Sequence, residues 1–181
     1  MKKHYLLILS IFTVFAFTSC SNDDDSNSND SNASTDSVLE IDGENFQLKA
    51  GVIEEYGESF SGDGYNFDIS LFNSEISLVN GDYLPEDDNI TGIYFELWSE
   101  SSSNLSSGTY TQDYSENPFT YTYGDVVIEY NMDTEQASYL EIVSGDVIIS
   151  RNGSNYEINF DGTASNGSEI SLYYKGTLMT Y

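Results

Sequence analysis

The sequence predicts an all-β fold: a single antiparallel β-sandwich of about eight to ten strands, with a jelly-roll or barrel-like sheet as the alternative. Three observations indicate this class. Apolar and polar residues alternate with a period of two in several segments, for example over residues 65–71 and 156–160. Turn-forming dipeptides such as Asp42-Gly43 separate these segments. Finally, no long stretch shows helical periodicity, and the chain contains only two prolines.

The predicted domain starts with two strands joined by a tight turn. Residues 38–41 and 46–53 are the strands, and Asp42-Gly43 between them accepts the positive φ angles of a two-residue hairpin. Residues 65–71 form the next strand, with apolar side chains on one face and polar side chains on the other. This alternation predicts a sheet that is buried on one face and wet on the other.

The second half of the domain contains three further turns between predicted strands. They lie at residues 133–136, 152–153 and 166–167. The apolar positions also change face between Tyr123 and Val126. We therefore expect a β-bulge or a corner near Gly124-Asp125, because an extra residue in one strand reverses the alternation.

The first 37 residues differ in composition from the rest of the chain. Residues 1–19 have a basic head and an apolar run at 6–17, which indicates a secretory signal peptide, since the run is too short for a membrane span of about 20 residues. Residues 20–37 consist of Cys20 and a Ser/Asn/Asp-rich segment with too few apolar side chains to fold, so we expect a disordered acidic tether. The β domain is then expected at 38–181.

The segment Phe17-Thr18-Ser19-Cys20 resembles the lipobox of bacterial lipoproteins. In that family the cysteine is acylated with chains such as palmitate and the leader is cut before it. Lipidation would account for a lone cysteine in an exported chain, and several acyl chains together anchor a protein stably. The alternative is an ordinary signal peptide with an incidental cysteine.

Two further patterns point to the same family. The Asp23–Asp25 cluster resembles the acidic export signal of surface lipoproteins in Bacteroidota. Residues 145–160 read G-x-V-x-I-x-R-x-G-x-x-Y-x-I-x-F, which resembles a group of small β-rich lipoproteins from that phylum. The resemblance implies an outer-membrane protein that is lipid-anchored and faces the cell exterior, and it carries over no catalytic residue.

Composition excludes several classes of function. The chain has 31 acidic and 5 basic residues, with a formal net charge of −26. Nucleic-acid binding is excluded because its affinity comes largely from Lys and Arg. Membrane contact must come through the lipid, whereas cationic partners or divalent metals are favoured.

Processing would also remove His4 and would modify the only thiol. Catalytic triads and metal sites built on His or Cys are therefore not expected, and we predict no cofactor except calcium. We do not expect an enzyme. A glycosidase needs only two carboxylates at a defined separation, but no pair stands out in the sequence.

Residues 92–98 contain the first candidate ligand site. If their alternate apolar side chains face the core, Tyr94, Glu96 and Trp98 point outward in a row. Aromatic rings around a carboxylate could bind a sugar, with the rings on its apolar face and the acid on its hydroxyls. The alternative is that these side chains cover a sheet edge or pack beneath a loop.

Residues 80–89 contain the second candidate site. Asp82, Glu86, Asp87 and Asp88 supply clustered oxygens of the kind that calcium prefers, although the spacing differs from that of an EF-hand loop. The alternative is a solvated acidic loop.

The functional expectation is a surface-exposed binding module for glycans or other extracellular ligands. The alternative is a structural, interaction or adhesion subunit of the cell envelope without a small-molecule site. The glycan expectation requires an exposed Trp98. The remaining basic residues, Lys49, Arg151 and Lys175, are expected to be surface ion-pair partners.

Overall fold

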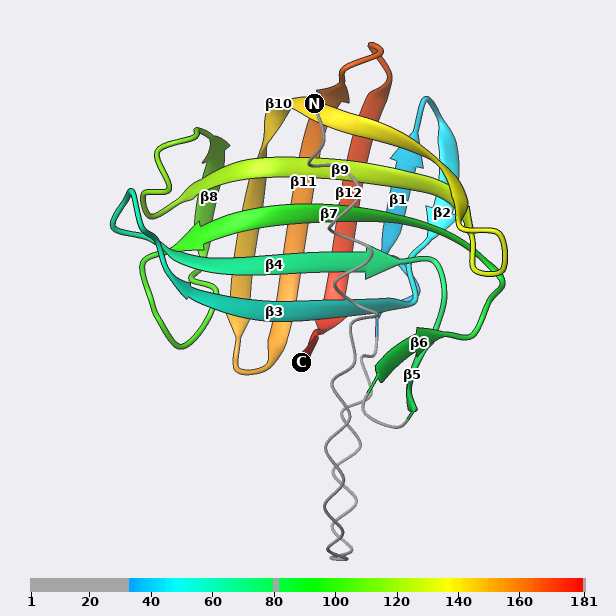
Figure 1. The fold of residues 1–181 in the computed structure, drawn as a ribbon, viewed down its shortest axis with the longest axis horizontal. Coiled ribbons are helices and arrows are strands. Elements are labelled where there is room, and N and C mark those ends of the chain that lie inside the picture. The colour runs from blue at the N-terminus through cyan, green and yellow to red at the C-terminus, as the bar shows by residue number, and fades with distance from the viewer. Residues whose placement is uncertain (1–32, 80–81, 181) are drawn as a thin grey trace, which may run out of the picture.

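A computed structural model describes residues 33–79 and 82–180, and the described chain is built of β-strands (Figure 1). In chain order they are β1 (Val38–Ile41), β2 (Glu44–Gln47), β3 (Ala50–Glu58), β4 (Tyr65–Phe72), β5 (Ile76–Val79), β6 (Asp82–Pro85), β7 (Asn89–Ser99), β8 (Gly108–Gln112), β9 (Thr120–Asn131), β10 (Gln136–Asn152), β11 (Asn155–Ala164), β12 (Glu169–Thr177) and β13 (Met179–Thr180). Within these ranges no helix has the length and apolar character needed to cross a membrane. The predicted leader, Cys20 and most of the predicted tether lie outside the described residues.

The strands form one large sheet and one small one. The large sheet has 11 strands in the order β13-β3-β4-β7-β9-β8-β10-β11-β12-β1-β2, and β5 and β6 form a separate hairpin. The all-β prediction is therefore confirmed, but the main sheet is continuous instead of two stacked sheets. The expected strand number was too low, because β2, β5, β6 and β13 have only two to four residues and show no readable alternation.

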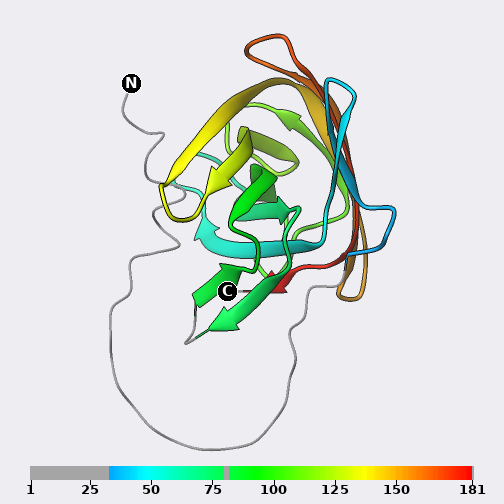
Figure 2. The same ribbon diagram turned by 90° about the vertical axis from the view of Figure 1, so that its right-hand side faces the viewer.

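The large sheet curls so that its two halves face each other. In Figure 1 the strands β3, β4, β7 and β9 cross in front of β8, β10, β11, β12 and β1, and Figure 2 shows the curl from the side. The 17-residue strand β10 joins the halves, since its first part pairs with β9 and its second part with β8 and β11. At the other end, β13 returns to pair in parallel with β3.

The core lies between these two halves. Phe95 of β7 packs against Phe160 of β11, with ring centroids 5.1 Å apart, and edge-on against Tyr121 of β9 at 5.7 Å. The Tyr121 hydroxyl donates to the Gly145 carbonyl at 2.8 Å, so its one polar atom is satisfied in the interior. As predicted, the alternating apolar residues of β4, β7, β11 and β12 supply this core.

The predicted turns are confirmed. Asp42 and Gly43 have φ angles of +50° and +85°, as a two-residue hairpin with two left-handed positions requires. Strands β10 and β11 meet in a tight hairpin at Gly153, and β9 and β10 are joined by residues 132–135. The expected bulge is also present, slightly earlier than predicted: Glu96 and Leu97 pair with residues 123 and 121 of β9, which leaves Thr122 as the extra residue.

Two boundaries differ from the sequence prediction. Residues 33–37 were expected to be disordered tether, but Ala33 forms a β-bridge with Gly176 and Ser37 is fully buried. The predicted strand over residues 46–53 is divided, because the chain leaves β2 after Gln47 and starts β3 at Ala50 in the opposite half of the sheet. Both errors arose because contacts distant in sequence decided the local structure.

Candidate functional site

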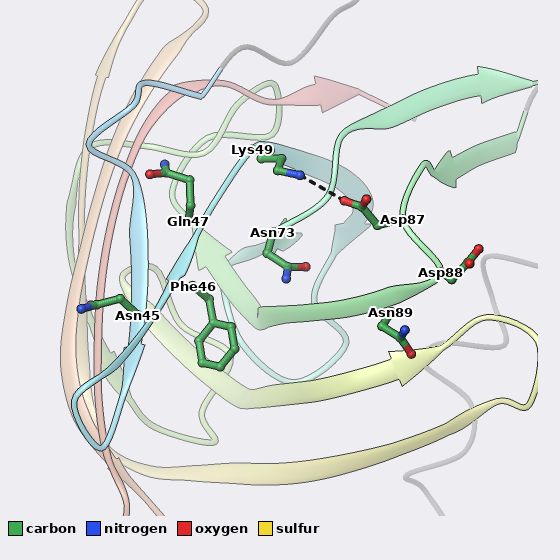
Figure 3. A pocket seen from close by; sticks show the side chains of 8 residues that line it. All are labelled: Asn45, Phe46, Gln47, Lys49, Asn73, Asp87, Asp88 and Asn89. Atoms are coloured by element: carbon green, nitrogen blue, oxygen red, sulfur yellow. Dashed lines mark hydrogen bonds and ion pairs between the residues drawn. The ribbon is translucent and has the colours of Figure 1, made fainter.

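An open pocket lies at one end of the curled sheet, where the β2 edge and the ends of β4 and β7 separate (Figure 3). We call it the mouth pocket. It has a volume of about 550 Å³. It is lined by Asn45, Phe46, Gln47, Lys49, Asn73, Asp87, Asp88 and Asn89. Its lining therefore combines amides, one aromatic ring and one lysine with two carboxyl groups.

Short polar contacts hold the walls of the mouth pocket. Ser74, which is fully buried, accepts hydrogen bonds from the backbone N–H groups of Glu86 and Asp87 at 3.2 and 3.0 Å. Asn73 accepts from the Thr91 N–H at 2.8 Å, which fixes the connection that follows β4 against β7. These contacts position the pocket-lining side chains before any ligand arrives.

Two amides of the mouth pocket, Asn73 and Asn89, are only partly used by the protein itself. Asn73 and Asn89 each accept one hydrogen bond through Oδ1, from the Thr91 N–H and from Asn131 Nδ2. Within the described chain, no hydrogen bond is made by their Nδ2 groups. An amide group can donate and accept at the same time, so these side chains suit ligands that carry many hydroxyl groups.

The charged residues of the mouth pocket form an ion pair. Lys49 Nζ lies 3.1 Å from Asp87 Oδ2, and both side chains are well exposed. The hydrogen bond from Lys49, followed by the one that links Asp87 to Ser74, holds the pKa of Asp87 below its usual value. A general acid of a glycosidase needs a raised pKa, so this carboxylate is suited to binding and not to proton donation.

The described side chains among the predicted calcium ligands, those of Glu86, Asp87 and Asp88, do not form a metal-binding group. Asp87 faces Lys49, whereas Glu86 accepts a hydrogen bond from the Ser77 hydroxyl in the β5–β6 hairpin. Asp88 lines the mouth pocket, and the Asp82 side chain lies outside the described residues. In the described ranges, no group of three or more His, Cys, Asp or Glu side chains could hold a metal ion.

The expectation that Trp98 is exposed is wrong. Its side chain is only 6% exposed, and its Nε1–H donates to Thr122 Oγ1 at 3.0 Å. The backbone around Gly64 lies against it, and the Trp98 carbonyl accepts a hydrogen bond from the Phe119 N–H. Trp98 is thus packed beneath the neighbouring loops, which was the alternative considered from the sequence.

The other two members of the predicted row, Tyr94 and Glu96, are half-buried on the outer face of the front strands. Tyr94 donates its hydroxyl hydrogen to Asp68 Oδ2 at 2.5 Å, and Asn66 Nδ2 donates to Asp68 Oδ1 at 2.9 Å. Glu96 pairs directly across from Asp68 in the β4–β7 register. Asp68 is therefore the residue that links the polar side chains of this face, and the sequence prediction does not single it out.

Asp68 is a buried carboxyl group on the outer face of the sheet. It is 8% exposed, and desolvation raises its pKa to about 7 against the opposing effect of its two hydrogen bonds. The negative charges of Glu96 and Glu54 on the flanking strands raise it further. We call Glu54, Asp68 and Glu96 the carboxylate row, because they lie opposite one another on β3, β4 and β7.

Comparisons with family models, curated proteins and solved structures find no match for this chain.

Sequence reasoning missed Phe46, Asn73 and Asp68. Phe46 was read as part of a long strand, although its position after the Asp42-Gly43 hairpin was a usable signal that the strand could be short. Asn73 follows a strand end, where polar residues are common. Asp68 lies on the polar side of an alternating strand, and nothing in the local sequence indicates that neighbouring strands bury it.

Proposed function

We propose that this protein is a lipid-anchored binding module at the outer face of the outer membrane, with the mouth pocket as the site for a hydroxyl-rich ligand such as a carbohydrate. The curled sheet acts as a barrel-like scaffold whose filled core leaves its end available for binding. One observation carries the choice of ligand: the mouth pocket combines four amide side chains with the Phe46 ring. Pockets of this size with a few placed polar groups are typical of small-ligand sites.

The chemistry of the two kinds of side chain is complementary. The amides of Asn45 and Asn73 would donate to and accept from ligand hydroxyls, and Asp87 would accept from them. Gln47 would only accept, because its Nε2 group already donates to the Ser37 and Leu48 carbonyls. Phe46 would cover the apolar face of a sugar ring, while its own inner side packs against the core. This assignment moves the proposed aromatic contact from Trp98 to Phe46.

Glycan-array binding by the purified protein tests the choice of ligand, followed by titration of the best glycan against Phe46→Ala and Asn45→Ala. We expect each variant to weaken binding by about tenfold or more, which corresponds to about 1.4 kcal/mol. Phe60→Ala is the matched control, since Phe60 is a fully exposed phenylalanine that does not line the mouth pocket. Equal affinity of all variants would place the ligand elsewhere, and no glycan bound at millimolar concentration would exclude carbohydrates.

The proposed location rests on Cys20 and the acidic residues that follow it. Mass spectrometry of protein from its native host should show an acylated Cys20 at the new N-terminus. An unmodified thiol, or a chain that retains residues 1–19, would contradict lipid anchoring without affecting the mouth pocket.

One observation favours the alternative of an interaction or adhesion subunit. The β5–β6 hairpin extends from the main sheet, and its Leu78 and Val79 side chains are 60% and 44% exposed (Figure 1). Sedimentation of the wild-type protein and of Leu78→Ser separates the two proposals. Self-association that the substitution abolishes would support the interaction role.

A further inference from the structure

The carboxylate row on the outer face of β3, β4 and β7 has an unusual electrostatic setting. Asp68 is at its centre, and the β-sheet register places Glu54 and Glu96 directly opposite it on either side. Like charges directly opposite one another destabilise a sheet. The cost is larger here because Asp68 is nearly excluded from water.

The groups around Asp68 supply hydrogen bonds and no positive charge. The strand register places Glu54 from β3, Asn66 and Ser70 from β4, Tyr94 and Glu96 from β7, and Tyr123 and Asp125 from β9 opposite or next to it. Tyr56 from β3 is also near, because its side chain is hydrogen-bonded to Glu54. Every titratable member of this set is an acid or a phenol.

The three basic residues of the described chain all have partners elsewhere. Lys49 pairs with Asp87 at 3.1 Å, and Lys175 pairs with Glu157 at 3.4 Å. Arg151 lies over the Tyr156 ring, 5.7 Å from its centroid. The carboxylate row is therefore not neutralised by Lys or Arg from the described part of the protein, and a proton on Asp68 is the simplest way to lower its charge.

The hydrogen-bond partner of Asp68 is not the group that loses the proton. Burial raises the pKa of the Tyr94 phenol far above its usual value, and the adjacent charge of Asp68 raises it further. We therefore expect Tyr94 to keep its proton over the pH range in which the carboxyl group of Asp68 titrates.

We propose that the carboxylate row is a proton switch: Asp68 holds a proton in acidic surroundings and releases it to solvent as the pH rises, and the resulting repulsion weakens the packing of β4 against β3 and β7. The proposal does not depend on the ligand or on the lipid anchor. It makes the front half of the sheet, formed by β3, β4, β7 and β9, a part of the protein that responds to pH near neutrality.

The direction in which stability changes with pH follows from the raised pKa of Asp68. Asp68 has a pKa of about 7 in the folded protein, above the ordinary value of 3.8. The stabilising contribution of the protonated form is therefore complete below about pH 4 and is lost as the pH rises through about 7. Across that window we expect the folding equilibrium constant to fall by roughly a hundredfold to a thousandfold through Asp68 alone.

Two measurements on the purified protein test the switch. Carbon-13 NMR of the aspartate carboxyl groups, with Asp68→Asn for assignment, should show Asp68 titrating with a midpoint between about pH 6 and 8. Denaturant unfolding between pH 5 and 8 should show stability falling with pH in the wild type and falling much less in Asp68→Asn. Asp87→Asn is the matched control, because it also removes one carboxylate but should leave the slope in this window unchanged.

Trp98 provides a local readout that needs no variant. It is the only tryptophan and lies opposite Asn66, which donates to Asp68. Its fluorescence should change with the same midpoint as the Asp68 carboxyl resonance. An Asp68 midpoint below about pH 5 would overturn the proposal, as would equal pH slopes for the wild type and Asp68→Asn. If Asp68→Asn fails to fold, the wild-type titration and Trp98 fluorescence decide the matter.

Discussion

Two aspartates of this protein have pKa values that are shifted in opposite directions: Asp87 in the mouth pocket and Asp68 in the carboxylate row. Asp87 is exposed and pairs with Lys49, and its pKa lies below the usual value. Asp68 is buried and is flanked by Glu54 and Glu96, and its pKa is raised to about 7. Both belong to a chain with a net charge of −26, yet their pKa values are shifted in opposite directions.

The difference shows that overall charge says little about an individual carboxylate. Solvent access and the nearest charged group set the pKa, and both depend on which strands become neighbours. The mouth pocket has a cation and is open to solvent, so it can present a fixed negative charge to a ligand. On the outer face Asp68 is buried without a Lys or Arg partner, so in the proposed switch this face responds to protons instead.

Removing the acceptor on Asp68 should have the largest effect on stability. Asp68→Ala removes the acceptor that the Asn66 amide and the Tyr94 hydroxyl share. Asn66 is buried and Tyr94 is half-buried, so water replaces that acceptor poorly. We expect the unfolding free energy at pH 5 to fall by about 2–4 kcal/mol, because each unsatisfied buried donor costs about 1–3 kcal/mol. Denaturant unfolding measures this, and Asp68→Asn, which keeps an acceptor oxygen, should lose clearly less.

Removing the donor on Tyr94 should have a smaller effect with a distinct signature. Tyr94→Phe deletes the hydrogen bond to Asp68 but keeps the ring, so we expect a loss of about 1 kcal/mol. Since that hydrogen bond favours the ionised carboxylate, the Asp68 midpoint should move to higher pH. A midpoint that moved downward in the carboxyl NMR titration would refute this account of the site.

The pH response of Asp87 should be smaller still and opposite in sign. Its folded-state pKa is lowered, so its ion pair stabilises the protein above the unfolded value of about 4 and is lost as the pH falls further. Because the pair is exposed, solvent screens it. Comparing unfolding of the wild type and Asp87→Asn at pH 3 and pH 6 should show a larger difference at pH 6 than at pH 3.

The smallest stability effect is expected at Lys49. Lys49→Met removes the cation from the mouth pocket, and the thermal midpoint should stay within experimental error because exposed ion pairs contribute little. The pKa of Asp87 should return toward its ordinary value, which carboxyl NMR can follow. A large loss of stability would mean that the ion pair holds the residue 86–87 turn more strongly than its exposure indicates.

The alternation of side chains predicted much of the fold. It identified β4, β7, β11 and β12 and the faces that they bury, and Gly-containing dipeptides predicted the hairpins at Asp42-Gly43 and Gly153. These signals are local, because side-chain direction in a strand repeats every two residues and a left-handed turn favours Gly, Asn or Asp. Strand β2 was merged with β3 into one predicted strand, and β13 was missed because two residues cannot display a period.

The candidate sites were predicted less well, and Trp98 shows why. It lies on the same alternation of β7 as Tyr94 and Glu96, but it is buried and the backbone around Gly64 lies against it. Tyr94 and Glu96 were placed on the correct face, yet their partner Asp68 comes from a strand 26 residues earlier in the chain. The mouth pocket likewise joins residue 46 to residue 89, which no local pattern connects.

The sequence by itself determined the all-β class, the buried faces of the longer strands, the main turns and the strongly acidic surface. Only the tertiary structure decided that the strands make one curled sheet, that Trp98 is covered, and that Glu54, Asp68 and Glu96 stand side by side. The reason is physical: periodicity and turn preference act between near neighbours in the chain, whereas burial and charge proximity depend on strand register between distant segments.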